Sequence, residues 1–304
     1  MIKNFYHFVN NLTLPNNVVG LSRSLLAFGG LSIFLFNDMS VILFNGNPRG
    51  IVMLPSNWML NELNIFSIFP EGYSFFSWLL SVLILLLVLI GWRPRITAIP
   101  HCWLLYSFFY YSMLPNGGDQ IALVLSLLLL PINLMDKRKW HWQKAVEVSK
   151  EYKPIYNLIL LFFLVLIKLQ VSALYLEAAT SKFQVIEWAN GTAVYYWFTN
   201  PMFGASGWIL YLLKPILTNS IGVTLLTWGA IFIELLLFMG IVMKKEYRPY
   251  LLLVGILFHF GILLIHGLVS FFFFISAALV LYLVPVDYNF EMSISIFKRY
   301  FSFK

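Results

Sequence analysis

Four lysine and glutamate side chains lie within, or at the end of, long apolar stretches of this chain. Lys168, Glu177 and Lys182 fall in or at the end of one stretch, and Glu234 lies in the middle of another. A charged side chain inside a membrane-spanning segment costs several kcal/mol, so such residues usually transfer protons, bind a ligand or pair with one another. An amine whose pKa is lowered by burial can act as a general base. These residues therefore predict a polar site within the apolar part of the protein.

Lys168 and Glu234 are expected to lie at a similar depth in the membrane. Lys168 is thirteen residues beyond Ile155 and Glu234 is ten residues from Lys244, which gives about 20 Å and about 15 Å at 1.5 Å per residue. An ion pair between Lys168 and Glu234 is the least expensive way to hold both. A structural pair and a role in proton handling or substrate binding are both compatible with this position.

The helix that carries Glu177 is expected to turn a polar face toward other helices. Gln170, Ala173, Glu177 and Ser181 follow one another at spacings of three and four residues, so these small or polar residues share one face. Lys182 comes five residues after Glu177, at the predicted outer end of the helix. Its amine could extend harmlessly to water or serve in the site.

Two histidines are predicted to share a face of a later helix. His259 and His266 are seven residues apart, and this spacing places them on the same side of a helix. Such a pair can relay protons or bind a polar ligand, although a single buried imidazole is often only hydrogen-bonded to a neighbour.

The stretch LPNGGDQ, residues 114–120, reads as an outer turn before a helix. Gly117 and Gly118 permit a positive φ, and Asp119 is well placed to cap the helix that follows. Capping alone would explain the carboxylate of Asp119. Alternatively, Asn116 and Asp119 line one outward-facing cavity together with Glu177, Lys182 and His266.

Composition places these residues in a membrane protein. Hydrophobic residues make up 60% of the 304 residues and charged residues 11%, with a mean hydropathy of +0.81, which lies far outside the range of soluble domains. The net charge of +7 does not indicate nucleic-acid binding, because the basic residues cluster between the apolar stretches. Cys102 is the single cysteine, and no cluster of Cys and His has the spacing of metal ligands.

Hydropathy predicts an all-α polytopic bundle of about eight transmembrane helices. These are expected at about residues 20–37, 74–91, 96–113, 119–135, 155–180, 221–243, 249–266 and 268–284. The chain then divides into an N-terminal segment at 1–17, a transmembrane domain at 18–285 and a basic tail at 286–304.

The distribution of basic residues predicts the orientation of the bundle. Fifteen Lys and Arg residues fall on the side that carries both termini, against three on the other side. Because Lys and Arg concentrate on the cytoplasmic side of membranes, both termini are predicted to be cytoplasmic. Arg23, at the inner end of the first helix, is expected to extend toward lipid phosphates.

The longest outer segment, residues 181–220, is rich in aromatic residues. These are Trp188, Tyr195, Tyr196, Trp197, Phe198, Phe203, Trp208 and Tyr211. Aromatic side chains concentrate where a chain lies in the membrane interface, so an interfacial helical segment is predicted here. It could cover the bundle as a lid or serve only as an aromatic anchor.

The stretch YLEAATSKFQVIEWANGTAVYYW resembles the HTTM family, the membrane domain shared with vitamin K-dependent gamma-glutamyl carboxylases. The matching positions are Lys182, Trp188, Gly191, Thr192 and Ala193. NGGDQ at 116–120, Glu234 in FIELLLF and His259 in FHFGI agree in order, so the resemblance extends over about residues 18–285. Within this group, NNVVGLSRSLLAFGGLSIFLFN at 16–37 and the length of the chain look most like the SdpB family of sporulation-delaying toxin systems.

The resemblance implies a function at the bacterial plasma membrane. A multi-pass SdpB-like protein is expected to act with a small SdpA-like partner on a secreted precursor, yielding an antimicrobial peptide. Similarity to the carboxylases implies Lys182 as a base, with a quinone as the implied cofactor, and makes Glu177 and His259 its candidate catalytic neighbours. Asn116, Asp119, Trp188, Gly191, His266, Lys168 and Glu234 would line the cavity.

Two departures make carboxylation of glutamate doubtful. The turn before the fourth helix has Asn116 and Asp119 where the carboxylases have a catalytic histidine, and no soluble substrate-binding domain follows. A quinone-linked membrane enzyme, a proton-coupled peptide exporter and a scaffold for a processing partner are therefore alternative readings.

Overall fold

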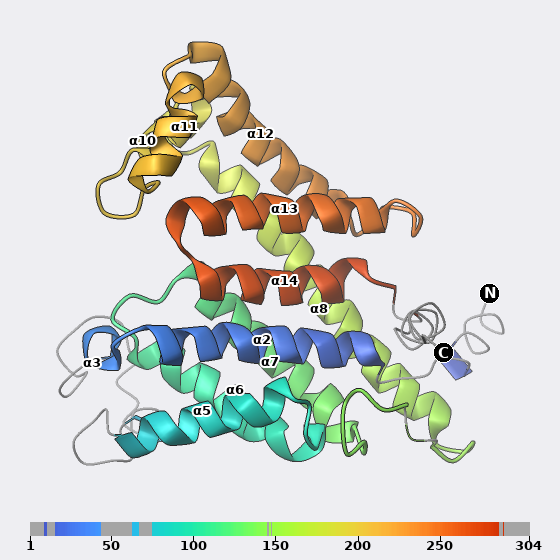
Figure 1. Cartoon of the computed structure of the whole chain (residues 1–304). Coiled ribbons are helices and arrows are strands. Elements are labelled where there is room, and N and C mark those ends of the chain that lie inside the picture. Colours follow the sequence, from blue (N-terminus) through green and yellow to red (C-terminus); the bar gives the residue numbers. More distant parts are fainter. Residues whose placement is uncertain are drawn as a thin grey trace, which may run out of the picture. The chain divides into compact units, whose positions relative to one another are not determined.

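The computed structural model describes residues 9–10, 16–43, 63–66, 75–144, 146, 148–285 and 288. The named elements of this part are all α-helices (Figure 1), and its two antiparallel bridges, Leu43 with Ser112 and Trp92 with Trp140, are isolated. The chain forms two compact units, Met1–Leu166 with Pro285–Lys304 and Ile167–Val284. Each unit is described by itself.

The described part of the first unit is a group of α-helices. It contains α2 (Asn17–Phe36), α3 (Met39–Ile42), α5 (Phe75–Leu89), α6 (Pro94–Tyr111), α7 (Gly117–Met135) and the beginning of α8 (Lys153–Lys182). Its most extensive helix contacts are those of α6 with α7 and of α2 with α5. The core of this unit therefore forms where these two pairs of apolar helices pack side by side.

Local chemistry explains where two of these helices begin. At the start of α7, the Asn116 side chain accepts hydrogen bonds from the backbone of Gly118 and Asp119, and Asp119 accepts one from the backbone of Asn116. This capping box satisfies N–H groups that no helical carbonyl can reach. Asn16 caps α2 in a similar way through Val19. The expectation that Asp119 helps to cap a helix is therefore confirmed.

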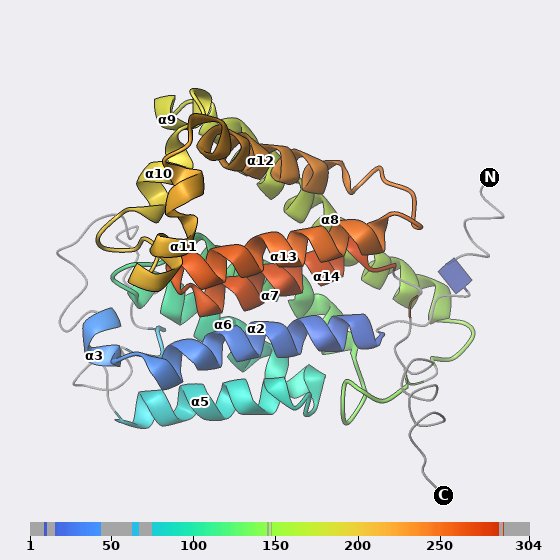
Figure 2. The same cartoon turned by 45° about the horizontal axis from the view of Figure 1, so that its top comes forward.

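The second unit contains the end of α8 and six further helices. These are α9 (Ile186–Ala189), α10 (Ala193–Phe198), α11 (Gly207–Leu217), α12 (Ser220–Met239), α13 (Arg248–His266) and α14 (Val269–Leu283). Helix α13 packs on both α12 and α14, while the short helices α10 and α11 pack against α12 (Figure 2).

All eight expected helices are present within a few residues of the predicted bounds. Five of them, α2, α7, α8, α12 and α13, are long and apolar enough to cross a membrane, whereas α5 and α14 have 15 residues each. The all-helical class is thus confirmed for the described residues, and the five long apolar helices are consistent with a membrane protein. The count of eight spans, the orientation of the termini and the domain boundaries stay predictions.

The end of helix α8 lies beside the second half of α12 rather than beside its first residues. Lys182, the last residue of α8, contacts Glu234, which lies fourteen residues, or about 21 Å, after the first residue of α12. The short helices fill the space along the first half of α12, where the backbone N–H of Val194 donates to the Thr227 hydroxyl at 3.2 Å. Lys182 is thus covered by the chain that follows it.

Candidate functional site

Lys182 and Glu234 form the central ion pair of the second unit. The Lys182 ammonium lies 2.7 and 2.8 Å from the two carboxylate oxygens of Glu234, and it also donates to the backbone oxygen of Ala178 at 3.0 Å. The side chains are 20% and 10% exposed. Charge-assisted hydrogen bonds of this length are strong, and partial burial protects them from solvent screening. The amine is therefore held in the protein and does not extend into water.

Trp188 covers the amine from the α9 side. The Lys182 ammonium lies 5.1 Å from the centre of the Trp188 ring, within the range of a cation–π interaction. The turn after α9 is pressed against α12, because Gly191 has a φ of +83° and a Cβ there would come within 2.9 Å of Thr224. Gly191 thus allows the segment rich in aromatic residues, 181–220, to approach α12 closely. We call it the aromatic segment.

His259 and Tyr175 lie in the same unit as the ion pair. The Nδ1 atom of His259 is 2.8 Å from the backbone oxygen of Gly255. Since a carbonyl can only accept, Nδ1 carries a proton, and a neutral ring leaves Nε2 as an acceptor. The Tyr175 and His259 ring centres are 6.0 Å apart in an edge-on arrangement. Both side chains are buried.

Electrostatic interactions connect these groups. Tyr175 lies within electrostatic range of the Glu234 carboxylate, and His259 lies within that of the Lys182 ammonium. The opposite charges of the ion pair compensate each other, while the phenol and imidazole contribute a donor and an acceptor. Together these side chains can bind a polar group and move protons.

The expected pair between Lys168 and Glu234 is wrong. Lys168 donates to the backbone oxygen of Tyr282 in the last turn of α14, while Glu234 binds Lys182. A cation at a helix C-terminus is favoured by the unsatisfied carbonyls and the helix dipole. Comparable depth was therefore not enough to identify the partner.

The prediction that the small and polar face of α8 points toward other helices is also wrong. Glu177, Gln170, Ala173 and Ser181 are exposed in the structure. The buried face consists of Ile167, Val171, Tyr175 and Ala179, which follow one another at intervals of four residues. Helices in lipid associate through close van der Waals packing and hydrogen bonds, so a small polar stripe does not by itself determine which face is turned inward. Lys182 continues the buried face, three residues after Ala179.

His266 connects α13 to the aromatic segment. Its Nδ1 lies 2.7 Å from the backbone oxygen of Phe203, and its ring contacts Trp197 and Phe198.

Asn116 and Asp119 belong to the first unit. A common cavity of Asp119 with Lys182 and His266 therefore stays a prediction.

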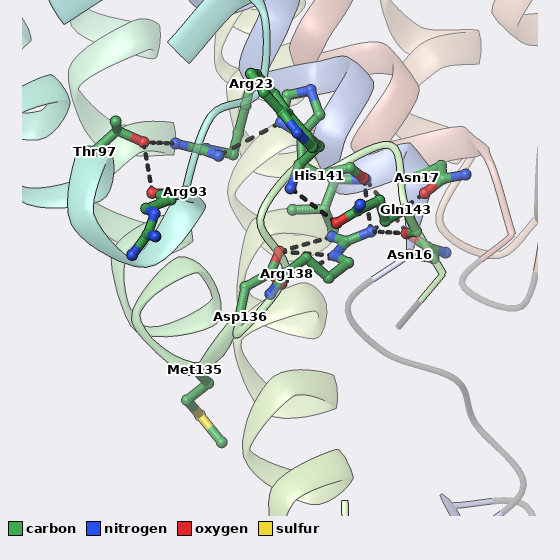
Figure 3. Close-up of polar contacts among 12 residues, drawn as sticks. Asn16, Asn17, Arg23, Arg93, Thr97, Met135, Asp136, Arg138, His141 and Gln143 are labelled. Atoms are coloured by element: carbon green, nitrogen blue, oxygen red, sulfur yellow. Dashed lines mark hydrogen bonds and ion pairs between the residues drawn. The ribbon is translucent and has the colours of Figure 1, made fainter. Parts of the chain in front are cut away.

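A second polar cluster lies in the first unit (Figure 3), in the segment that connects α7 and α8. Arg138 binds both carboxylate oxygens of Asp136, with its shortest contact at 2.7 Å, and donates to the backbone oxygens of His141 and Gln143 and to the side chain of Asn17. The two charged side chains are almost completely buried. The cluster therefore ties this connecting segment to the start of α2.

Arg23 joins the same cluster from α2. It donates to the Thr97 hydroxyl at 2.9 Å and faces Nδ1 of His141 at 3.5 Å (Figure 3). Only 1% of Arg23 is exposed, so the expected extension toward lipid phosphates is wrong. The His141 ring packs against Gly20 and Gly91, and its Nε2 is 3.3 Å from the Ser24 hydroxyl.

Burial, followed by the charges of Arg23 and Arg138, lowers the pKa of His141 to about 2. The ring is therefore neutral at physiological pH. Its Nδ1 accepts from Arg23, which leaves the proton on Nε2 facing Ser24.

Sequence reasoning missed this cluster because it counted Arg138 among the basic residues that set orientation. The available signal was an acid, Asp136, two residues before Arg138 and next to three consecutive basic residues. The sequence alone does not identify which base such an acid binds.

Comparison with known proteins finds relatives that align over most of the chain. It is 36% identical over 281 residues to Sporulation-delaying protein SdpB of Bacillus subtilis (strain 168), an alignment that covers 91% of this chain and 84% of that protein. It is 34% identical over 275 residues to Uncharacterized protein YitO of the same organism, with coverage of 89% and 86%. No protein-family model and no solved structure matches the chain. Identity at this level over most of both chains means that this protein belongs to the SdpB family.

Proposed function

We propose that this chain is a multi-pass component of the bacterial plasma membrane that is required to produce a secreted peptide toxin of the sporulation-delaying type. Membership of the SdpB family supports this function. A small SdpA-like protein and a secreted precursor peptide are its proposed partners. The observation that carries a role in the chemistry is the ion pair of Lys182 and Glu234 beneath Trp188.

In this proposal Lys182, Glu234 and His259 act together on the precursor. A base must offer a free lone pair, whereas the nitrogen of Lys182 donates hydrogen bonds to both carboxylate oxygens of Glu234, at 2.7 and 2.8 Å. Lys182 therefore becomes a base only when Glu234 accepts its proton or when a ligand separates the pair. Glu234 takes the role first given to Glu177, because Glu177 is exposed.

The same contact argues against a quinone-linked, carboxylase-like reaction with Lys182 as a ready base. That chemistry needs a free amine when the cofactor is bound, and the bidentate contact with Glu234 opposes it. We therefore assign no step to a quinone. An exporter based on Lys168 is also less supported, because Lys168 binds a helix-terminal carbonyl and not Glu234.

Replacement of Lys182 by Ala tests the proposal in cells that synthesise the precursor. The secreted peptide is measured by mass spectrometry, and the amount of the protein in the membrane is measured in parallel. We expect the mature peptide to be lost while the precursor persists. Lys214→Ala is the matched control, because Lys214 is an exposed lysine of the same unit. Normal mature peptide from a correctly inserted Lys182→Ala protein would refute the proposed role.

A further inference from the structure

The hydroxyl of Tyr175 is a buried polar group without a hydrogen-bond partner. In the described part of the second unit, it is the only buried side-chain nitrogen or oxygen of this kind. Tyr175 is 2% exposed, so solvent does not satisfy the hydroxyl. A buried hydroxyl that makes no hydrogen bond destabilises the fold, whereas phenylalanine would provide similar packing without this penalty. The ligand-free fold thus gives no reason for tyrosine here.

The surroundings of the hydroxyl are those of the candidate site. Tyr175 lies on the buried face of α8, seven residues before Lys182, its ring meets His259 edge-on, and its hydroxyl experiences the charge of Glu234. Lys182, at the other end of this group, has a side chain that is 20% exposed, so this end of the group lies at the surface.

The balance of charges and donors indicates which chemistry would suit this position. Lys182 and Glu234 cancel each other's charge, so the site has no net charge with which to attract an ion. The carboxylate and Nε2 of His259 are already acceptors, and the unpartnered group is an O–H. A neutral ligand that offers an acceptor oxygen would complement this arrangement.

We propose that the Tyr175 hydroxyl binds a carbonyl oxygen of a neutral ligand held beside the ion pair of Lys182 and Glu234. The carbonyl could come from a peptide backbone or from a lipid ester, and both present the same acceptor. Tyr175 is a ligand-binding residue in this proposal. The inference deepens the proposed function and rests on it only in placing the precursor peptide at this site.

Two tyrosines of the second unit give a matched test. Tyr282 is also buried, but its hydroxyl donates to the backbone oxygen of Phe238 at 2.9 Å. In purified full-length protein without ligand, Tyr282→Phe should lower the melting temperature by about 3 °C, since a formed hydrogen bond is lost. Tyr175→Phe should leave it unchanged or raise it. A decrease for Tyr175→Phe as large as that for Tyr282→Phe would mean an internal structural partner and would overturn the proposal.

Binding is then measured by thermal shift with two probes, acetyl-Leu-Leu-Leu-amide for a peptide carbonyl and monoolein for an ester carbonyl. Dodecane, which has no carbonyl, is the control. We expect at least one probe to stabilise the wild-type protein, and we expect Tyr175→Phe to weaken that binding about tenfold while Tyr282→Phe does not. The probe that binds identifies the source of the carbonyl.

Equal binding by the wild type and Tyr175→Phe, or no binding of either probe to the wild type, would overturn the inference. Toxin production that survives Lys182→Ala would refute the proposed function instead, and the binding measurement would still decide the role of Tyr175.

Discussion

Lys182 and Glu234, which are separated by 52 residues in sequence, meet through two hydrogen bonds of 2.7 and 2.8 Å. One residue ends α8 and the other lies in the second half of α12. Their contact therefore joins two long apolar helices through their charged groups. Its energetic and functional consequences can be separated by mutation.

Replacing Glu234 by Gln should destabilise the protein strongly. The change leaves the Lys182 ammonium in a partly buried position without a carboxylate, and the loss of one partner from a buried pair typically costs about 3 kcal/mol. Thermal unfolding in detergent measures the effect. Glu177→Gln on the exposed face of α8 is the control and should change stability by less than about 0.5 kcal/mol. Equal effects of the two variants would contradict the observed pairing.

Exchanging the two charges should separate stability from activity. A protein with both Lys182→Glu and Glu234→Lys keeps opposite charges at the contact, so it should be more stable than Glu234→Gln alone. Production of mature peptide should nevertheless stay lost, because the amine then lies on α12. Recovery of both stability and peptide would reduce the pair to a structural role.

Arg138 and Lys137 should respond very differently to the same substitution. Arg138→Gln removes the cation that pairs with the buried carboxylate of Asp136, which keeps only the backbone N–H of residue 138 as a donor, and it leaves two backbone oxygens without the guanidinium, so we expect a loss of about 3 kcal/mol. Lys137 is exposed, and Lys137→Gln should be close to neutral. Chemical denaturation of both variants gives the comparison. A small effect at Arg138 would show that the buried cluster contributes little.

Gly91 should not tolerate even a methyl group. Its φ is +84°, which disfavours other residues, and a Cβ there would collide with the His141 ring. We expect Gly91→Ala to cost about 2 kcal/mol. Gly117→Ala, where the added Cβ has no neighbour within 4 Å, should be neutral or slightly stabilising. The melting temperatures of the two variants test this difference. An unchanged melting temperature for Gly91→Ala would be inconsistent with the packing of His141.

Stability should decrease at acidic pH through His141. Its pKa is about 2 in the folded protein and about 6.5 in an unfolded chain, so protons bind preferentially to the unfolded state between these values. The contribution of the neutral ring is complete above pH 6.5 and is lost as the pH falls toward 2. At pH 5 the loss is about 2 kcal/mol. Measuring the free energy of unfolding against pH for the wild type and for His141→Gln gives the contribution of His141. Identical pH dependence in the two proteins would exclude this contribution.

Helix positions in this protein could be predicted from local sequence because each helix satisfies its own backbone hydrogen bonds within one apolar stretch. The run before Lys182 and the run around Glu234 were therefore located correctly. The Asn116 and Asp119 cap was also accessible, since its partners are only three residues apart. The family could likewise be recognised from the order of residues alone, without knowledge of how the helices pack.

The partners of the charged residues could not be obtained in this way. Glu234 binds Lys182 and not Lys168 because α8 ends beside the second half of α12, and that alignment depends on apolar packing between distant segments. The same packing buries Tyr175 and leaves Glu177 exposed. The sequence by itself thus determined the helices and the kinds of groups available for chemistry. Only the tertiary structure decided which groups meet, because contacts of a few ångströms depend on how whole helices align.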